Sequence, residues 1–156
     1  MEIFSSSPPG ETPDIEKPAH ILLIEDSPVD VQLLRLALDQ QGQKYKLQVL
    51  RDGAEALLFV DQHRTASMSD PKPCVIILDL HIPKHGGVAV LQAIRRAPVL
   101  SHIHILVLTS ATSPEEELEA RYLGVRLYRE KPHDLREFLE VAQLIFEICK
   151  GEPVPA

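Results

Sequence analysis

The sequence contains no long apolar run: no stretch approaches the ~20 consecutive apolar residues that a membrane-spanning helix requires. The first residues also lack a basic segment followed by an apolar one, which argues against a secretion signal and favours a cytoplasmic location. An excess of positive charge is missing as well. The net charge of −7 argues against nucleic acid or an anionic membrane surface as a partner.

Patterns of metal-binding and disulfide-forming residues are also scarce. The seven histidines are scattered and show no zinc-ligand spacing. The two cysteines, Cys74 and Cys149, are far apart in the sequence and lie inside apolar segments. We therefore expect two buried thiols of a cytosolic protein, rather than a disulfide or a metal site.

What the chain does contain suits one folded domain, because 44% of its 156 residues are hydrophobic and can form a core. Residues 1–18 are rich in serine and proline and have almost nothing to bury, which predicts a flexible leader. Residues 151–156 form a short tail with two prolines. We expect the folded domain to span residues 19–150.

Between these ends, the hydrophobic period alternates five times between that of a strand and that of a helix. Five βα units predict an α/β fold, a doubly wound parallel sheet with five helices on its two faces. The strands near residues 20–24, 74–78 and 103–108 are apolar at nearly every position, as strands buried on both faces are. Those near 46–50 and 125–129 alternate, as edge strands do. This pattern predicts the strand order 2-1-3-4-5.

Reactive side chains follow these strands at the points where the strands end. The ends carry, in chain order, Glu25 and Asp26, Asp79, Thr109, and Lys131. Because the carboxyl ends of parallel strands lie at one edge of the sheet, we expect these groups to meet in one crevice. Asp79 follows the third, fully apolar strand, so we place it at the centre of the site.

Three carboxylates that converge on one small volume repel one another, and such crowding is tolerated mainly around a cation. Magnesium is the natural choice, since it binds carboxylate oxygens, retains waters and then accepts a phosphate oxygen. With the Lys131 ammonium and the Thr109 hydroxyl, the site predicts in-line phosphoryl transfer to Asp79, which forms an aspartyl phosphate. The metal and the lysine would neutralise the charge that develops on the phosphoryl oxygens.

This combination resembles the response-regulator receiver domain, the phosphoacceptor half of bacterial two-component signalling, over roughly residues 19–150. The resemblance is carried by an acidic pair, the aspartate, a proline and a glycine beyond it, a hydroxyl residue, an aromatic residue and a lysine–proline pair: Glu25-Asp26, Asp79, Pro83, Gly87, Thr109, Tyr128 and Lys131-Pro132. It implies a flavodoxin-like receiver fold in which Asp79, Thr109 and Lys131 carry the chemistry. It also implies a Mg²⁺ site formed by Glu25, Asp26, Asp79 and the backbone carbonyl of His81.

Segments 21–28 and 51–57 are further similar to the stand-alone regulators that accompany phytochrome kinases. The resemblance implies a single-domain response regulator rather than an enzyme. Such a regulator catalyses only its own phosphotransfer and dephosphorylation. A sensor histidine kinase, of the phytochrome type in the finer comparison, would be its phosphoryl donor. The signal would pass by protein contact or to a downstream phosphorelay protein. Phosphorylation would draw Thr109 toward the phosphoryl group and let Tyr128 turn inward, which reshapes the surface nearby.

The last predicted helix, residues 134–150, carries two apolar stripes. One must cover the sheet, whereas Val141, Leu144 and Ile148 form a second stripe outside it. Three aliphatic side chains in line favour a contact surface, so we expect a homodimer through this helix. The alternative is that the second stripe only widens the core-facing surface.

Other functions fit parts of the pattern. A magnesium-dependent phosphatase of the haloacid-dehalogenase type also uses a strand-end aspartate, but it needs a second aspartate two positions on, where this chain has His81. A pseudo-receiver that acts as a scaffold would lack the acidic pair or the lysine, and both are present. Flavin binding suits the strand order, but Glu25 and Asp26 would repel a phosphate after the first strand.

Overall fold

The computed structural model describes residues 17–64 and 71–151. Its strands are β1 (Ala19–Ile24), β2 (Tyr45–Leu50), β3 (Val75–Leu78), β4 (His104–Thr109) and β5 (Leu127–Glu130). Its helices are α2 (Pro28–Asp39), α3 (Gly53–Gln62), α4 (Gly86–Arg96), α5 (Pro114–Tyr122) and α6 (Leu135–Cys149). The strands form one parallel sheet in the order β2-β1-β3-β4-β5, which confirms the predicted fold. Nearly all of the predicted leader and tail lies outside the described residues, so the predicted domain boundaries stay predictions.

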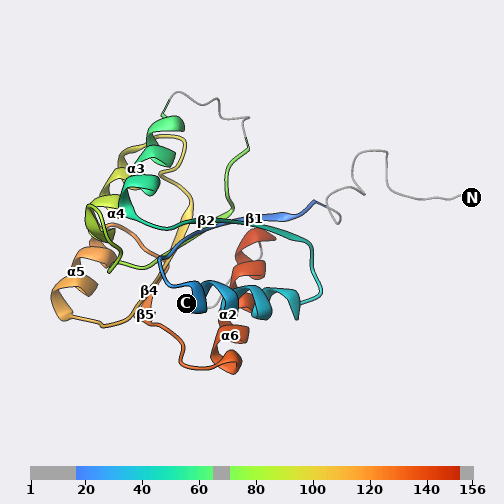
Figure 1. The fold of residues 1–156 in the computed structure, drawn as a ribbon. Coiled ribbons are helices and arrows are strands. Elements are labelled where there is room, and N and C mark those ends of the chain that lie inside the picture. Colours follow the sequence, from blue (N-terminus) through green and yellow to red (C-terminus); the bar gives the residue numbers. More distant parts are fainter. Residues whose placement is uncertain (1–16, 65–70, 152–156) are drawn as a thin grey trace, which may run out of the picture.

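Two apolar cores lie on the two faces of the sheet. Successive side chains of a strand point to opposite faces, so Ile21 and Leu23 lie in one core and Leu22 and Ile24 lie in the other. Helices α2 and α6 cover the first core, and α3, α4 and α5 cover the second (Figure 1). The strands β1, β3 and β4 are buried on both faces, which explains their nearly continuous apolar sequence.

Four of the helices begin at the polar residues that cap them. The side chains of Ser27, Asp52, Ser113 and Asp134 each accept a hydrogen bond from a backbone N–H in the first turn. Helix α4 begins differently, after Lys84 and His85, which both have the positive φ angles that ordinary residues rarely adopt (61° and 78°). This loop between β3 and α4 borders the strand end that carries Asp79.

The two cysteines form a disulfide, so the prediction of two separate thiols was wrong. Cys74 immediately precedes β3 and Cys149 ends α6, and their Cα atoms are 5.2 Å apart. That separation lies within the range that a disulfide spans. Helix α6 runs back along the sheet, which brings its last residue beside the beginning of β3. The sequence separation of 75 residues concealed this proximity.

The second apolar stripe of the last helix is not a surface, which removes the observation behind the predicted homodimer. Val141 is 2% exposed and Ile148 is 7% exposed, and Leu144 packs against the same core. These side chains belong to the core that α6 shares with α2, because α2 packs along one side of α6 (Figure 1). The alternative reading, a wider core-facing surface, is the correct one.

Among the described residues, no helix is long and apolar enough to cross a membrane.

Candidate functional site

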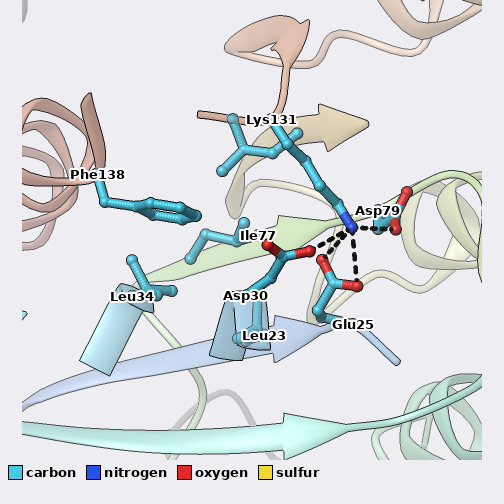
Figure 2. Close-up of a pocket in the computed structure, with 9 residues that line it drawn as sticks. Leu23, Glu25, Asp30, Leu34, Ile77, Asp79, Lys131 and Phe138 are labelled. Carbon is cyan, nitrogen blue, oxygen red and sulfur yellow. Dashed lines mark hydrogen bonds and ion pairs between the residues drawn. The ribbon is translucent and has the colours of Figure 1, made fainter. Parts of the chain in front are cut away.

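The Lys131 ammonium lies at the centre of the polar crevice at the carboxyl ends of the strands. Its Nζ is 2.9 Å from a carboxylate oxygen of each of Glu25, Asp30 and Asp79 (Figure 2). Glu25 follows β1, Asp79 follows β3 and Lys131 follows β5, so the parallel sheet delivers them to one edge as predicted. The lysine side chain itself is only 15% exposed.

An acidic cluster adjoins this lysine. Glu25, Asp26 and Asp79 each offer a carboxylate oxygen, and these oxygens lie within 4.8 Å of one another. Glu25 and Asp79 are buried, whereas Asp26 is exposed at the rim of the crevice. Hard oxygen ligands at this spacing fit a divalent cation such as magnesium, which keeps several waters beside its carboxylates. Solvent can reach such an ion from the side of Asp26.

The charge balance of the crevice perturbs its titrating groups. Burial raises the pKa of Glu25 to about 7, helped by the neighbouring Asp79 charge and opposed by the hydrogen bond from Lys131. Burial alone would lower the pKa of Lys131, but its hydrogen bonds with Asp30, Asp79 and Glu25 outweigh burial and raise it. The crevice therefore holds more negative charge than one lysine neutralises. This excess favours a bound cation.

The loop after Asp79 is held close against the first turn of α4. The His81 N–H donates to Asp79 Oδ1 at 2.9 Å, which orients the carboxylate. Gly87 allows the helix to approach, because a Cβ at that position would overlap the Leu80 Cα and lie 2.8 Å from the Asp79 carbonyl oxygen. The glycine of the predicted motif is therefore explained by close packing beside the site.

Thr109 ends β4 and is fully buried. Its hydroxyl donates to the Ala111 carbonyl at 3.4 Å, and its own carbonyl accepts the Lys131 N–H at 2.8 Å. The second contact ties the ends of β4 and β5 together. It therefore fixes the lysine backbone beside the hydroxyl residue.

A polar chain leads from this edge to helix α5. His81 Nε2 lies 3.1 Å from both carboxylate oxygens of Glu116, and the Tyr128 hydroxyl accepts the Ser113 N–H at 3.1 Å. Tyr128 is only 9% exposed. We predicted that this ring turns inward on phosphorylation, whereas it already lies inward in this structure, held by the N-terminus of α5.

Asp30 was not among the site residues predicted from the sequence. This residue lies in the first turn of α2, where acidic side chains commonly do no more than favour the helix N-terminus. The available signal was its position one helical turn beyond Asp26, which keeps it at the same edge of the sheet. The structure adds it to the lysine's partners, and neither the apolar pattern nor the motif spacing singled it out.

The fold and this crevice are those of a receiver domain, and the chain belongs to the response regulator receiver domain family, whose model matches residues 21–143. It is 34% identical over 126 residues to the response regulator Rcp1 of Synechocystis sp., covering 81% of this chain and 85% of Rcp1.

Two solved structures of similar regulators share the fold. A Mn²⁺-bound form of Rcp1 matches with a TM-score of 0.73 and 32% identity, over 89% of this chain and all of that one. The phosphorylated cyanobacterial phytochrome response regulator RcpA matches with a TM-score of 0.75 and 27% identity, over 90% of this chain and all of that one. The chain is thus similar to phytochrome-associated regulators that consist of a single receiver domain. The recorded metal in Rcp1 accords with the acidic cluster described above.

Proposed function

We propose that the protein is a single-domain response regulator that accepts a phosphoryl group on Asp79 from a sensor histidine kinase. The observation that carries the proposal is the contact of buried Asp79 with Lys131, 2.9 Å apart, beside two further carboxylates within reach of one cation. A nucleophilic carboxylate, a fixed ammonium and a hard-cation site are the parts that phosphoryl transfer requires.

The positions of the side chains support the following proposed roles. Glu25, Asp26, Asp79 and the His81 carbonyl would hold Mg²⁺, which supplies positive charge for the phosphoryl oxygens. An oxygen of Asp79 attacks phosphorus while the bond from phosphorus to the donor's histidine nitrogen breaks. The bonding electron pair stays on that nitrogen, and a proton already on the other ring nitrogen makes the leaving group a neutral imidazole. Lys131 exchanges its contact with the Asp79 carboxylate for a phosphoryl oxygen. The Thr109 hydroxyl leaves the Ala111 carbonyl and donates to the phosphoryl group.

The same movements provide a route for the signal. When Thr109 changes its partner, the β4–α5 loop that contains Ala111 must adjust, and Tyr128 is attached to the end of that loop through Ser113. The proposed output is therefore a shift in the position of α5, read by a partner protein or coupled to phosphorelay.

Similarity to the cyanobacterial phytochrome response regulator RcpA supports a phytochrome-type kinase as the donor. A cytoplasmic location belongs to the same proposal, because that is where kinases draw on ATP. The homodimer stays a prediction, and the exposed stripe that suggested it is buried. Hydrolysis of other phosphate esters has less support. The phosphatases considered above need a second aspartate at the position of His81, and the His81 side chain pairs with Glu116 instead.

Intact-mass spectrometry after incubation with acetyl phosphate tests the proposal. We expect a gain of one phosphoryl group that requires Mg²⁺, occurs in wild type and is absent in Asp79→Asn. Asp61→Asn, which removes an exposed carboxylate on α3, is the charge-matched control and should be phosphorylated like wild type. Failure to gain mass, together with failure to bind beryllofluoride with Mg²⁺, would refute the proposed function.

A further inference from the structure

The three N–H donors of Lys131 are matched by three carboxylate partners, but these partners are not equivalent. Glu25 and Asp79 also belong to the acidic cluster that can hold a cation. Asp30 lies 2.9 Å from the same Nζ and is not a member of that cluster. An ion bound to the cluster would compete with Lys131 for two of its partners and leave the third.

We propose that Asp30 is a positioning residue that anchors Lys131 when the metal and the phosphoryl group engage its other two partners. The inference rests on the proposed function, because it assigns a further residue to the same site. The contact with Asp30 keeps the ammonium paired when the metal binds. Lys131 therefore does not compete with the metal for the carboxylate oxygens of Glu25 and Asp79. It also keeps the ammonium beside the position that a phosphoryl oxygen would occupy.

The backbone around Asp30 is suited to an anchor. Pro28 begins α2, and the Ser27 hydroxyl accepts the Asp30 N–H at 3.3 Å, which fixes the first turn. The Asp30 side chain is 24% exposed and lines the pocket with Glu25, Asp79 and Lys131 (Figure 2). Its carboxylate therefore extends from a rigid helix terminus and approaches the lysine from the side of α2.

The electrostatic consequence separates Asp30 from the other acids. Removing Glu25 or Asp79 would remove a candidate metal ligand, whereas removing the Asp30 charge leaves every candidate ligand in place. In Asp30→Asn, Lys131 would pair more strongly with Glu25 and Asp79, since its ammonium has lost one anionic partner. Metal binding would then have to displace a more strongly held lysine.

The first measurement is the Mg²⁺ affinity of the unphosphorylated full chain, from NMR titration of backbone amides. We expect the dissociation constant to rise about fivefold in Asp30→Asn, as for coupled groups in contact. The control Asp61→Asn, which loses the same charge from an exposed pair on α3, should stay within about twofold of wild type. Thermal melting checks that both variants fold, because Asp30 also lies in a first helical turn.

A double-mutant cycle shows whether Asp30 acts through Lys131. In a Lys131→Gln background, Asp30→Asn should change the Mg²⁺ affinity by less than about twofold, because the competing ammonium is gone. Asp30→Glu, which retains a carboxylate, should restore wild-type affinity. At saturating Mg²⁺, Asp30→Asn should also slow phosphorylation by acetyl phosphate, since the lysine is less well placed.

Three results would overturn the inference: an unchanged Mg²⁺ affinity in Asp30→Asn, an equal effect of Asp30→Asn with and without Lys131, or faster phosphorylation in Asp30→Asn. Failure of the proposed function is distinguishable, because wild type itself would then gain no phosphoryl group. The affinity measurements and the double-mutant cycle would still decide the role of Asp30.

Discussion

Replacement of Glu25 by glutamine is expected to stabilise the metal-free protein at alkaline pH, although it removes an ion-pair partner of Lys131. Glu25 is 4% exposed, and burial raises its pKa from 4.5 to about 7. A carboxyl with a raised pKa in the folded state binds its proton more tightly there than in the unfolded chain. It therefore contributes full stability below pH 4.5 and loses that contribution as the pH rises through 7.

The size of the effect follows from the same two values. At about 1.4 kcal/mol per pH unit between 4.5 and 7, the ionised Glu25 costs the folded state at most about 3 kcal/mol at pH 8. Glutamine has nearly the same shape and carries no charge at any pH. The stability advantage of Glu25→Gln should thus be small near pH 4.5 and grow to about 3 kcal/mol above pH 7.

Urea unfolding in EDTA, followed by far-ultraviolet circular dichroism because the chain has no tryptophan, measures this difference at pH 5 and pH 8. Comparing the variant with wild type at each pH cancels the contribution of the other acidic groups. Addition of Mg²⁺ at pH 8 should stabilise wild type more than the variant. A wild type that is the more stable protein at pH 8 would show that the Lys131 ion pair outweighs burial, which would refute the reasoning.

Three further substitutions test individual contacts of the fold. Gly87→Ala should destabilise the fold by more than about 2 kcal/mol in urea unfolding, because its Cβ would overlap the backbone at Leu80. The control Gly42→Ala, at a positive φ in open space, should cost only about 1 kcal/mol. Equal losses of stability in the two variants would contradict the packing explanation. Tyr128→Phe loses the hydroxyl that accepts the Ser113 N–H and should cost about 1 kcal/mol by the same method, with no change expected if that contact is absent in solution. Cys149→Ser opens the disulfide and should lower the free energy of unfolding by at most about 4 kcal/mol, since the bond closes a loop of 75 residues. Alkylation of unfolded wild type before and after reduction tests whether the bond is present, and two free thiols without reductant would contradict it.

Local sequence signals were sufficient for the arrangement of the chain. Alternating periods predicted five βα units, and the apolar or alternating character of each strand predicted the observed order. The caps at Ser27, Asp52 and Ser113 were also predictable, because a capping residue and its partner lie within a few positions of each other. Strand ends at one edge of a parallel sheet then brought Glu25, Asp79 and Lys131 together as expected.

The remaining features depend on contacts between elements that are distant in the sequence. Cys74 and Cys149 meet because α6 returns along the sheet, and the apparent surface stripe at Val141 and Ile148 is buried because α2 packs beside α6. Asp30 contacts Lys131 because the first turn of α2 lies at the end of β1. From the sequence alone, its position in a first helical turn is explained by the preference of acidic side chains for helix N-termini. The sequence by itself determined the order of the elements and the residue types at the strand ends, since both are written in short-range patterns. Which helix faces become buried, which cysteines pair and which carboxylates share the lysine were decided only by tertiary packing, which brings distant segments within reach of one another.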